Sequence, residues 1–361
     1  MLKHRTLLKI TAAMTVLVAG LPFSVHANEP MPVVATFSIL GDMVQRIGGS
    51  SVSVSTLVGR NGDTHVYQPT PADAKAVKRA DILFTNGLEF EGWLERLAEA
   101  AEFDGVTVAA TDGIDLISMD EHGDEHGDEH GDEHGDEHGD EHGDEEHAES
   151  SDNHDEEEGH DDEKNTDDHN DEEHDDHHDA HDHGEFDPHG WLSLQNARTY
   201  IDNITAALAI AAPEQAATFY ENRADYISEI ELLDGKIKSM IDAIPESDRT
   251  IITSHDAFQY FGRDYGLTFL APQGLSTESE ASARDVAELI EQIREDGIAA
   301  VFVENVADPR LIEQIANETG IAVGGELFPG ALSAEDGPAA TYLDLMNHNA
   351  TTIADTLAKK L

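Results

Sequence analysis

Residues 52–86, VSVSTLVGRNGDTHVYQPTPADAKAVKRADILFTN, predict a strand, a helix and a second strand. Val52–Val58 and Ile82–Asn86 are rich in β-branched and apolar residues, which favour buried strands. Between these strands a Thr-Pro pair opens the helix predicted over Ala72–Ala80, because threonine caps helices and proline suits their first position. Strands that alternate with helices in this way are typical of a parallel sheet with helices on both faces.

The same alternation extends along the rest of the chain. Further strands are predicted at Val33–Thr36, Val106–Ala109, Thr250–Ser254, Leu267–Ala271, Ala299–Val303 and Ile321–Gly324. Further helices are predicted at Ile39–Ile47, Glu91–Ala100, Leu192–Ala212, Pro213–Ala243, Ala257–Tyr265, Ser282–Glu295, Pro309–Thr319 and Pro338–Lys359. We therefore expect an α/β protein of two lobes. The helix at 213–243 would be roughly 45 Å long and would join the lobes stiffly.

The expected organisation follows from these patterns and from two unusual segments. It comprises a signal peptide at 1–27, an N-terminal α/β lobe at 28–119, a disordered acidic insert at 120–184, a return segment of the first lobe at 185–212, a linker helix at 213–243 and a C-terminal α/β lobe at 244–361. The signal peptide is predicted from a basic end, an apolar run too short to span a bilayer, and a small-residue cleavage site. A membrane anchor is the alternative interpretation of that run.

The insert begins with six tandem Asp-Glu-His-Gly repeats from Asp120 and holds 15 of the 21 histidines. It has almost no apolar residues, so it is expected to be disordered. Imidazoles beside carboxylates bind divalent transition metals, so we expect weak, multi-site capture of Zn²⁺, and also of Cu²⁺ and Ni²⁺. The auxiliary ligands we single out are His122, His126, His130, His134, His138, His142, His177, His178, His181 and His183. A plain solvated charge run is the alternative, but it leaves the histidines unexplained.

Charge and cysteine content limit the partners and the compartment. The formal net charge is −55, of which the insert contributes −32, so the chain repels nucleic acid and anionic membrane surfaces. The sequence contains no cysteine, which excludes disulfides, thiolate ligands and a lipid anchor on cysteine. We expect a periplasmic protein that is free of the membrane.

Three histidines outside the insert have specific contexts. His65 follows the strand 52–58, His189 lies in Asp-Pro-His-Gly-Trp-Leu after the insert, and His255 follows the strand 250–254. Ligands of open α/β sheets gather at the carboxyl ends of strands, so two facing lobes could bring these side chains together. Three imidazoles with an open fourth position suit Zn²⁺. The alternative is that each is a hydrogen-bonded polar residue without a ligand, and His348 is expected to face solvent.

These segments resemble the substrate-binding proteins of metal ABC transporters of cluster A-I, the ZnuA-like zinc-binding family. The matching motifs are residues 62–69 (GDTHVYQP), 187–192 (DPHGWL), 253–258 (TSHDAF) and 337–342 (GPAATY). The resemblance implies two Rossmann-like (β/α)4 lobes joined by a long rigid helix, with metal held between them by His65, His189 and His255. It also implies an inner-membrane ABC permease as partner, and we expect the protein to be a monomer.

The resemblance also bears on the choice of metal and on the fourth ligand. Manganese-binding members usually carry glutamate at the position of His255, so imidazole there favours zinc. Many members supply an aspartate where this chain has Gly330, and some zinc members use a glutamate where it has Thr64. The fourth position is therefore expected to hold water, with Asp336, Glu335 or a residue of the insert as alternatives.

The function predicted from the sequence is high-affinity capture of Zn²⁺ in the periplasm and its delivery to the permease. One alternative is a zinc hydrolase or hydratase, since three histidines and a zinc-bound water also form catalytic sites. No general base has a convincing motif, although Glu304 ends a strand and could face the cleft, with a structural ion pair as its other interpretation. A second alternative is a zinc reservoir or buffer based on the insert. We expect no enzymatic activity.

Overall fold

The computed structural model of the chain describes residues 29–118, 185–298 and 300–359. The predicted signal peptide, the histidines of the insert and its predicted disorder lie outside these residues. The described residues of 29–117 and 187–359 belong to one compact unit, and Ser118, Glu185 and Phe186 belong to a second. In the second unit the described residues Ser118 and Phe186 form an isolated antiparallel bridge. The first unit carries both predicted lobes.

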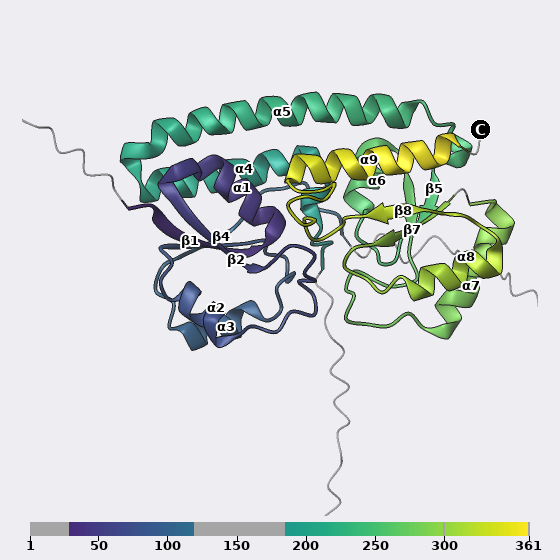
Figure 1. Ribbon diagram of the computed structural model, residues 1–361, viewed down its shortest axis with the longest axis horizontal. Coiled ribbons are helices and arrows are strands. Elements are labelled where there is room, and N and C mark those ends of the chain that lie inside the picture. Colours follow the sequence, from purple (N-terminus) through teal and green to yellow (C-terminus); the bar gives the residue numbers. More distant parts are fainter. Residues whose placement is uncertain (1–28, 119–184, 299, 360–361) are drawn as a thin grey trace, which may run out of the picture. The chain divides into compact units, whose positions relative to one another are not determined.

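Each lobe is built on a four-stranded, wholly parallel sheet (Figure 1). The first sheet has the order β2-β1-β3-β4 and comprises β1 (Met31–Phe37), β2 (Val52–Val58), β3 (Ile82–Thr85) and β4 (Val106–Ala109). The second has the order β6-β5-β7-β8 and comprises β5 (Thr250–Ile252), β6 (Thr268–Leu270), β7 (Ala300–Glu304) and β8 (Val323–Leu327). The expected α/β class with two similar lobes is confirmed.

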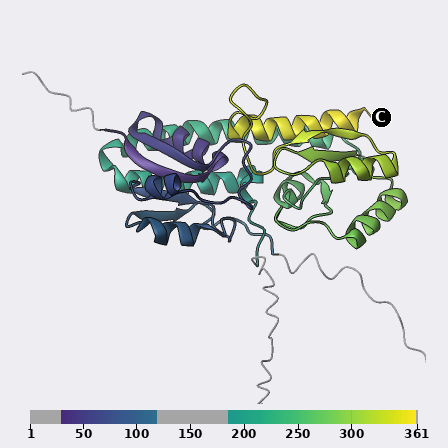
Figure 2. The same ribbon diagram turned by 60° about the horizontal axis from the view of Figure 1, so that its bottom comes forward.

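Helices cover both faces of each sheet (Figures 1 and 2). The helices of the first lobe are α1 (Ser38–Gly48), α2 (Pro71–Val77), α3 (Leu94–Ala101) and α4 (Leu194–Ala211), and those of the second are α6 (Gln259–Tyr265), α7 (Ala283–Asp296), α8 (Arg310–Thr319) and α9 (Tyr342–Ala358). The long connecting helix α5 spans Ala216–Asp242 and packs against α1 and α4 of the first lobe and α6 and α9 of the second. Among the described residues, no helix combines the length and apolar character needed to cross a membrane.

The core is shared between the lobes. One continuous cluster of buried apolar side chains runs from the first sheet through α4 and α5 to α6 and α9. Its largest members include Trp191, Tyr226, Phe258 and Tyr342, all without exposed surface. A smaller cluster lies between the second sheet and helices α7 and α8. Because α5 buries side chains against both lobes, it acts as a stiff connector, as expected from its length.

The strand order creates one switch point in each sheet. The chain leaves β1 for β2 on one side and crosses back to β3 on the other, and β5, β6 and β7 repeat this path. Crevices at such points, beyond the carboxyl ends of the strands, are where open α/β sheets bind ligands. The two crevices lie at the ends of β1 and β3 and at the ends of β5 and β7.

Several predicted boundaries shift for identifiable reasons. The last helix begins at Tyr342 rather than Pro338, because the side chain of Thr341 caps it by accepting a hydrogen bond from the Asp344 N–H. The helix predicted from Glu91 begins at Leu94, because Glu91 is buried in the first switch point. The linker predicted over 213–243 opens with a short 3₁₀ turn at Pro213–Gln215 before α5 begins.

Candidate metal centre

The structure brings the three singled-out histidines together. One nitrogen from each of His65, His189 and His255 lies within 4.8 Å of the corresponding nitrogens of the other two. The ring centroids are 5.5 Å apart for His65 and His189, 5.8 Å for His65 and His255, and 5.4 Å for His189 and His255. Within the described ranges this is the one group of three or more metal-ligating side chains.

His189 sits over the first switch point. Glu91 is buried there and accepts hydrogen bonds from Thr85 Oγ1 at 2.8 Å and from the Asn86 N–H at 2.7 Å. The Asn86 side chain in turn donates to the carbonyl oxygen of Pro188 at 2.9 Å. The carboxyl ends of the first sheet thereby hold the loop that carries His189.

The Asp187 carboxylate selects the ring nitrogen that His189 presents. Asp187 Oδ1 accepts from the backbone N–H of His189 at 2.8 Å and lies 2.8 Å from its Nδ1. Because a carboxylate only accepts, Nδ1 carries the proton and Nε2 is left with a lone pair. Nε2 of His189 is buried and has no hydrogen-bond partner among the described residues. Burial, followed by the nearby His255, holds the pKa of His189 well below its usual value, so the ring is neutral.

His255 lies at the second switch point and is oriented by Glu304 at the end of β7. Glu304 Oε1 accepts from the backbone N–H groups of Ser254 at 2.9 Å and His255 at 3.2 Å, and Oε2 contacts His255 Nδ1. Nε2 of His255 is thus the atom available to a metal. Burial alone would lower the pKa of His255, but the charge and hydrogen bond of Glu304 outweigh it and the pKa is raised.

His65 differs from the other two in its exposure and support. It is half-buried, whereas His189 and His255 are 0% and 1% exposed. Asp63 Oδ1 accepts from the backbone N–H of His65 at 3.0 Å and does not hold its ring as Asp187 holds that of His189. Burial, and then the proximity of His189 and His255, places the pKa of His65 well below its usual value.

Aromatic side chains form an apolar wall on one side of the histidines. Phe90 lies 5.0 Å from the ring of His65 and 5.9 Å from that of His189, and Trp191 lies 5.3 Å from His189. Phe37 packs behind both aromatics, at 5.2 Å from Phe90 and 4.8 Å from Trp191. This wall shields the rings of His65 and His189 from water and favours their neutral form, which is the form that binds metal.

The other candidate residues lie elsewhere. Asp336 and Glu335 are exposed and do not belong to the histidine group. The idea that either completes the coordination therefore finds no support in the structure. His348, expected to face solvent, is half-buried on α9 with its Nε2 3.0 Å from the carbonyl oxygen of Glu326. The ring is only partly exposed, because it packs 5.2 Å from Phe328.

Sequence reasoning missed the two aspartates beside the histidines, and it named Glu304 without identifying His255 as its partner. Asp63 and Asp187 each precede a candidate ligand by two positions and accept its backbone N–H. This Asp-x-His spacing was visible in the sequence and could have been used. Glu304 is 49 residues from His255, so their contact could not be read from spacing.

Comparisons with known proteins identify the family of this chain. The family described as "Zinc-uptake complex component A periplasmic" (ZnuA) matches residues 33–356. The chain is 27% identical over 333 residues to the manganese-binding lipoprotein MntA of Halalkalibacterium halodurans, covering 92% of this chain and 90% of the relative. It is 28% identical over 322 residues to the iron-binding protein YfeA of Yersinia pestis, covering 89% and 85%.

Solved structures share the fold. A manganese-bound S38A mutant of a periplasmic metal binding protein from Candidatus Liberibacter asiaticus aligns with a TM-score of 0.68 and 29% identity, covering 90% of this chain and 98% of that one. The periplasmic zinc binding protein TroA of Treponema pallidum aligns with a TM-score of 0.71 at 24% identity, covering 91% and 99%. From the family match and these likenesses, the chain belongs to the ZnuA family of metal-binding, substrate-binding proteins of ABC transporters.

Proposed function

We propose that this protein captures Zn²⁺ with high affinity and delivers it to an inner-membrane ABC permease. The observation that carries the proposal is the buried Nε2 of His189, a neutral nitrogen with no hydrogen-bond partner among the described residues. Leaving a buried polar atom unpaired costs roughly 1–3 kcal/mol, so such an atom calls for a ligand. One nitrogen from each of His65, His189 and His255 lies within 4.8 Å of the other two, in reach of one ion.

The chemistry of the ligands supports zinc as the metal. The three protein ligands would all be imidazoles, and nitrogen ligands suit Zn²⁺ better than Mn²⁺, which prefers oxygen. Some relatives are named for manganese or iron, so the metal must be tested directly on this chain. Three protein ligands leave a fourth tetrahedral position, which we assign to water. Copper and nickel are expected to bind the insert more weakly than zinc binds the centre.

Transport is favoured over catalysis by the position of Glu304. Both of its oxygens are occupied, by two backbone N–H groups and by the Nδ1 of His255. A general base needs a free oxygen within reach of its substrate, so this carboxylate orients a ligand instead. We therefore propose that the protein is not an enzyme. We also propose that it is a periplasmic monomer that is secreted by the segment 1–27.

The experiment measures zinc affinity by competition with a chromophoric chelator. His65→Ala, His189→Ala and His255→Ala variants, made in a chain lacking residues 121–183, should each lose the tight site. His348→Ala serves as the matched control, since it removes a histidine outside the group and should bind zinc like the parent. Unchanged affinity in all three variants would overturn the assignment. Tighter binding of Mn²⁺ than of Zn²⁺ by the parent protein would overturn the choice of metal.

A further inference from the structure

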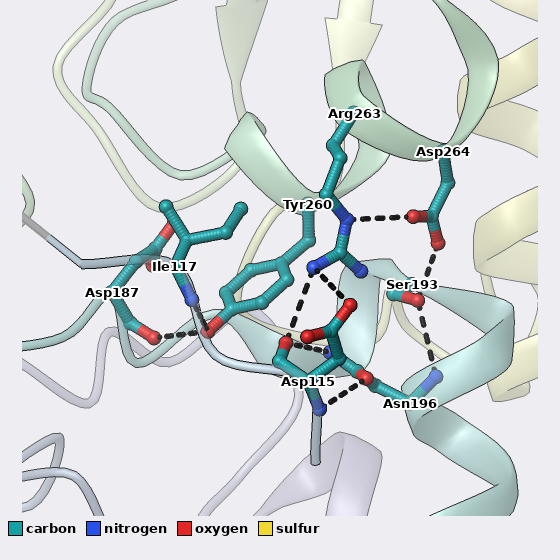
Figure 3. Close-up of polar contacts among 8 residues, drawn as sticks. All are labelled: Asp115, Ile117, Asp187, Ser193, Asn196, Tyr260, Arg263 and Asp264. Carbon is teal, nitrogen blue, oxygen red and sulfur yellow. Dashed lines mark hydrogen bonds and ion pairs between the residues drawn. The ribbon is translucent and has the colours of Figure 1, made fainter. Parts of the chain in front are cut away.

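Two hydroxyl groups of the second lobe hold the first-lobe segments that carry His65 and His189. Tyr260 on α6 donates to the carbonyl oxygen of Asp187 at 2.9 Å (Figure 3). Thr277, in the loop between β6 and α7, donates through Oγ1 to Asp63 Oδ2. Each hydroxyl thus contacts the aspartate that stands two positions before a histidine and binds its backbone N–H.

The Tyr260 hydroxyl is buried and both donates and accepts a hydrogen bond. It also accepts a hydrogen bond from the Ile117 N–H at 3.2 Å, and Tyr260 has no exposed surface. One turn further along α6, Arg263 donates to the backbone oxygen of Asp115 at 3.2 Å and stacks over the Tyr260 ring at 5.2 Å (Figure 3). Helix α6 therefore forms hydrogen bonds with two first-lobe segments, 115–117 and 187–189.

The same helix is attached to the third histidine. His255 precedes α6 by four residues, and the intervening Ala257 and Phe258 are completely buried. Any movement of Asp187 relative to α6 therefore also moves His189 relative to His255. Thr277 links the His65 loop to His255 in a similar way. It donates to Asp63 of the His65 loop, and Gln273 in the loop that carries Thr277 pairs with His255 in an isolated parallel bridge.

We propose that Tyr260 and Thr277 are positioning residues that set the spacing of His65 and His189 from His255. The inference rests on the proposed function, since it concerns the geometry of the same metal site. Three ligands from two lobes bind one ion well only if the lobes keep their register to about half an ångström. The long helix α5 restrains the lobes from a distance, whereas these two hydrogen bonds act beside the ligands.

The test uses Tyr260→Phe and Thr277→Val in the full chain, each of which removes a hydroxyl and little volume. Zinc affinity is expected to fall about tenfold in each, the lower end of the loss that follows removal of groups that orient metal ligands. The visible absorption of the Co²⁺-loaded protein, which reports ligand geometry, should change as well. Thr277→Ser keeps the hydroxyl and should behave like the parent.

Tyr265→Phe is the control for a purely structural effect. Tyr265 lies on the same helix and donates to Asp234 Oδ1 at 3.0 Å, away from the site. Its variant should lower the melting temperature without altering the Co²⁺ spectrum. Parental affinity and spectrum in both Tyr260→Phe and Thr277→Val would overturn the inference. A parent chain that binds no metal at the three histidines would instead overturn the proposed function, so the two failures are distinguishable.

Discussion

Among single residues, the three histidines differ in how readily they take up a proton. His65 and His189 have pKa values well below 6.5, because burial beside other imidazoles disfavours the charged form. His255 has a raised pKa, because the carboxylate of Glu304 outweighs the cost of its burial. His255 is therefore the first of the three ligands to take up a proton as the pH falls, and a metal must displace that single proton.

This difference predicts the slope of zinc affinity against pH. Above the raised pKa of His255 all three rings are neutral and affinity should be flat. Below it, affinity should fall about tenfold per pH unit, because one proton is lost for each ion bound. Chelator competition between about pH 8 and about pH 5.5, with the insert deleted, measures the slope. A thousandfold loss per unit would mean that three protons compete and that burial does not keep His65 and His189 neutral.

The sequence predicted the ligands better than their supports. Each candidate histidine follows a strand or a sharp change in composition, and these signals are local. The contact between Glu304 and His255 joins neighbouring strands that are 49 residues apart in the chain. The aromatic wall of Phe90 and Trp191 likewise depends on how the first lobe folds back after the insert. Such contacts need a topology before they can be predicted.

Among the elements, helix α2 shows how a short sequence signal anchors the His65 loop. The Thr70 side chain accepts from the Ala72 and Asp73 N–H groups, while Asp73 Oδ2 accepts from the Thr70 N–H at 2.6 Å. The same oxygen accepts from the Tyr67 hydroxyl at 2.8 Å, two residues after His65. This capping box therefore ends the ligand loop as well as starting the helix.

Removing the cap should cost a modest, measurable amount of stability. Thr70→Ala leaves two N–H groups of α2 without their side-chain partner and should lower the free energy of unfolding by about 1 kcal/mol. Urea denaturation of the metal-free protein measures this change. Thr70→Ser retains the hydroxyl and should stay within a few tenths of a kcal/mol of the parent. An equal loss in both variants would show that the methyl group, rather than the cap, matters.

The sequence predicts helix α2 well because the signals that start this helix are local. Strand positions were also predicted closely, since apolar and β-branched runs mark the interior of a parallel sheet. The ends of elements were less predictable where tertiary contacts decide them. The sequence predicts a helix start at Pro338, but the helix begins at Tyr342. There Thr341 caps it locally, and the Tyr342 N–H also donates to Asp42 Oδ2 of the first lobe at 3.0 Å. No local pattern contains that contact.

At the scale of the whole molecule, the proposed function gives the insert and the three-histidine centre separate roles in binding metal. The three imidazoles that lie together all come from the described residues 29–118 and 185–298. The insert then serves to raise the local concentration of zinc by weak binding at many sites. The buffer alternative assigns the tight site to the insert instead.

Deleting residues 121–183 separates these functions. The deletion should lower the number of zinc ions bound per chain while leaving the affinity of the tightest site unchanged. Elemental analysis gives the stoichiometry, and chelator competition gives the affinity. The complementary control is the full chain with all three site histidines replaced, which should retain only weak binding. Loss of tight binding on deletion would mean that the insert supplies a ligand or is itself the site.

The two ends of the insert meet at a backbone hydrogen bond, from the Asp187 N–H to the Ile117 carbonyl oxygen at 3.0 Å. Because the two ends of the insert lie side by side, the fold does not constrain the number of residues in the insert. Closing a flexible loop of twice the length costs only about 0.6 kcal/mol more. The number of Asp-Glu-His-Gly repeats can therefore change by duplication of the four-residue unit without disturbing the fold. Under the proposed function, the number of histidines in the insert can thus change in evolution without altering the three imidazoles of the centre.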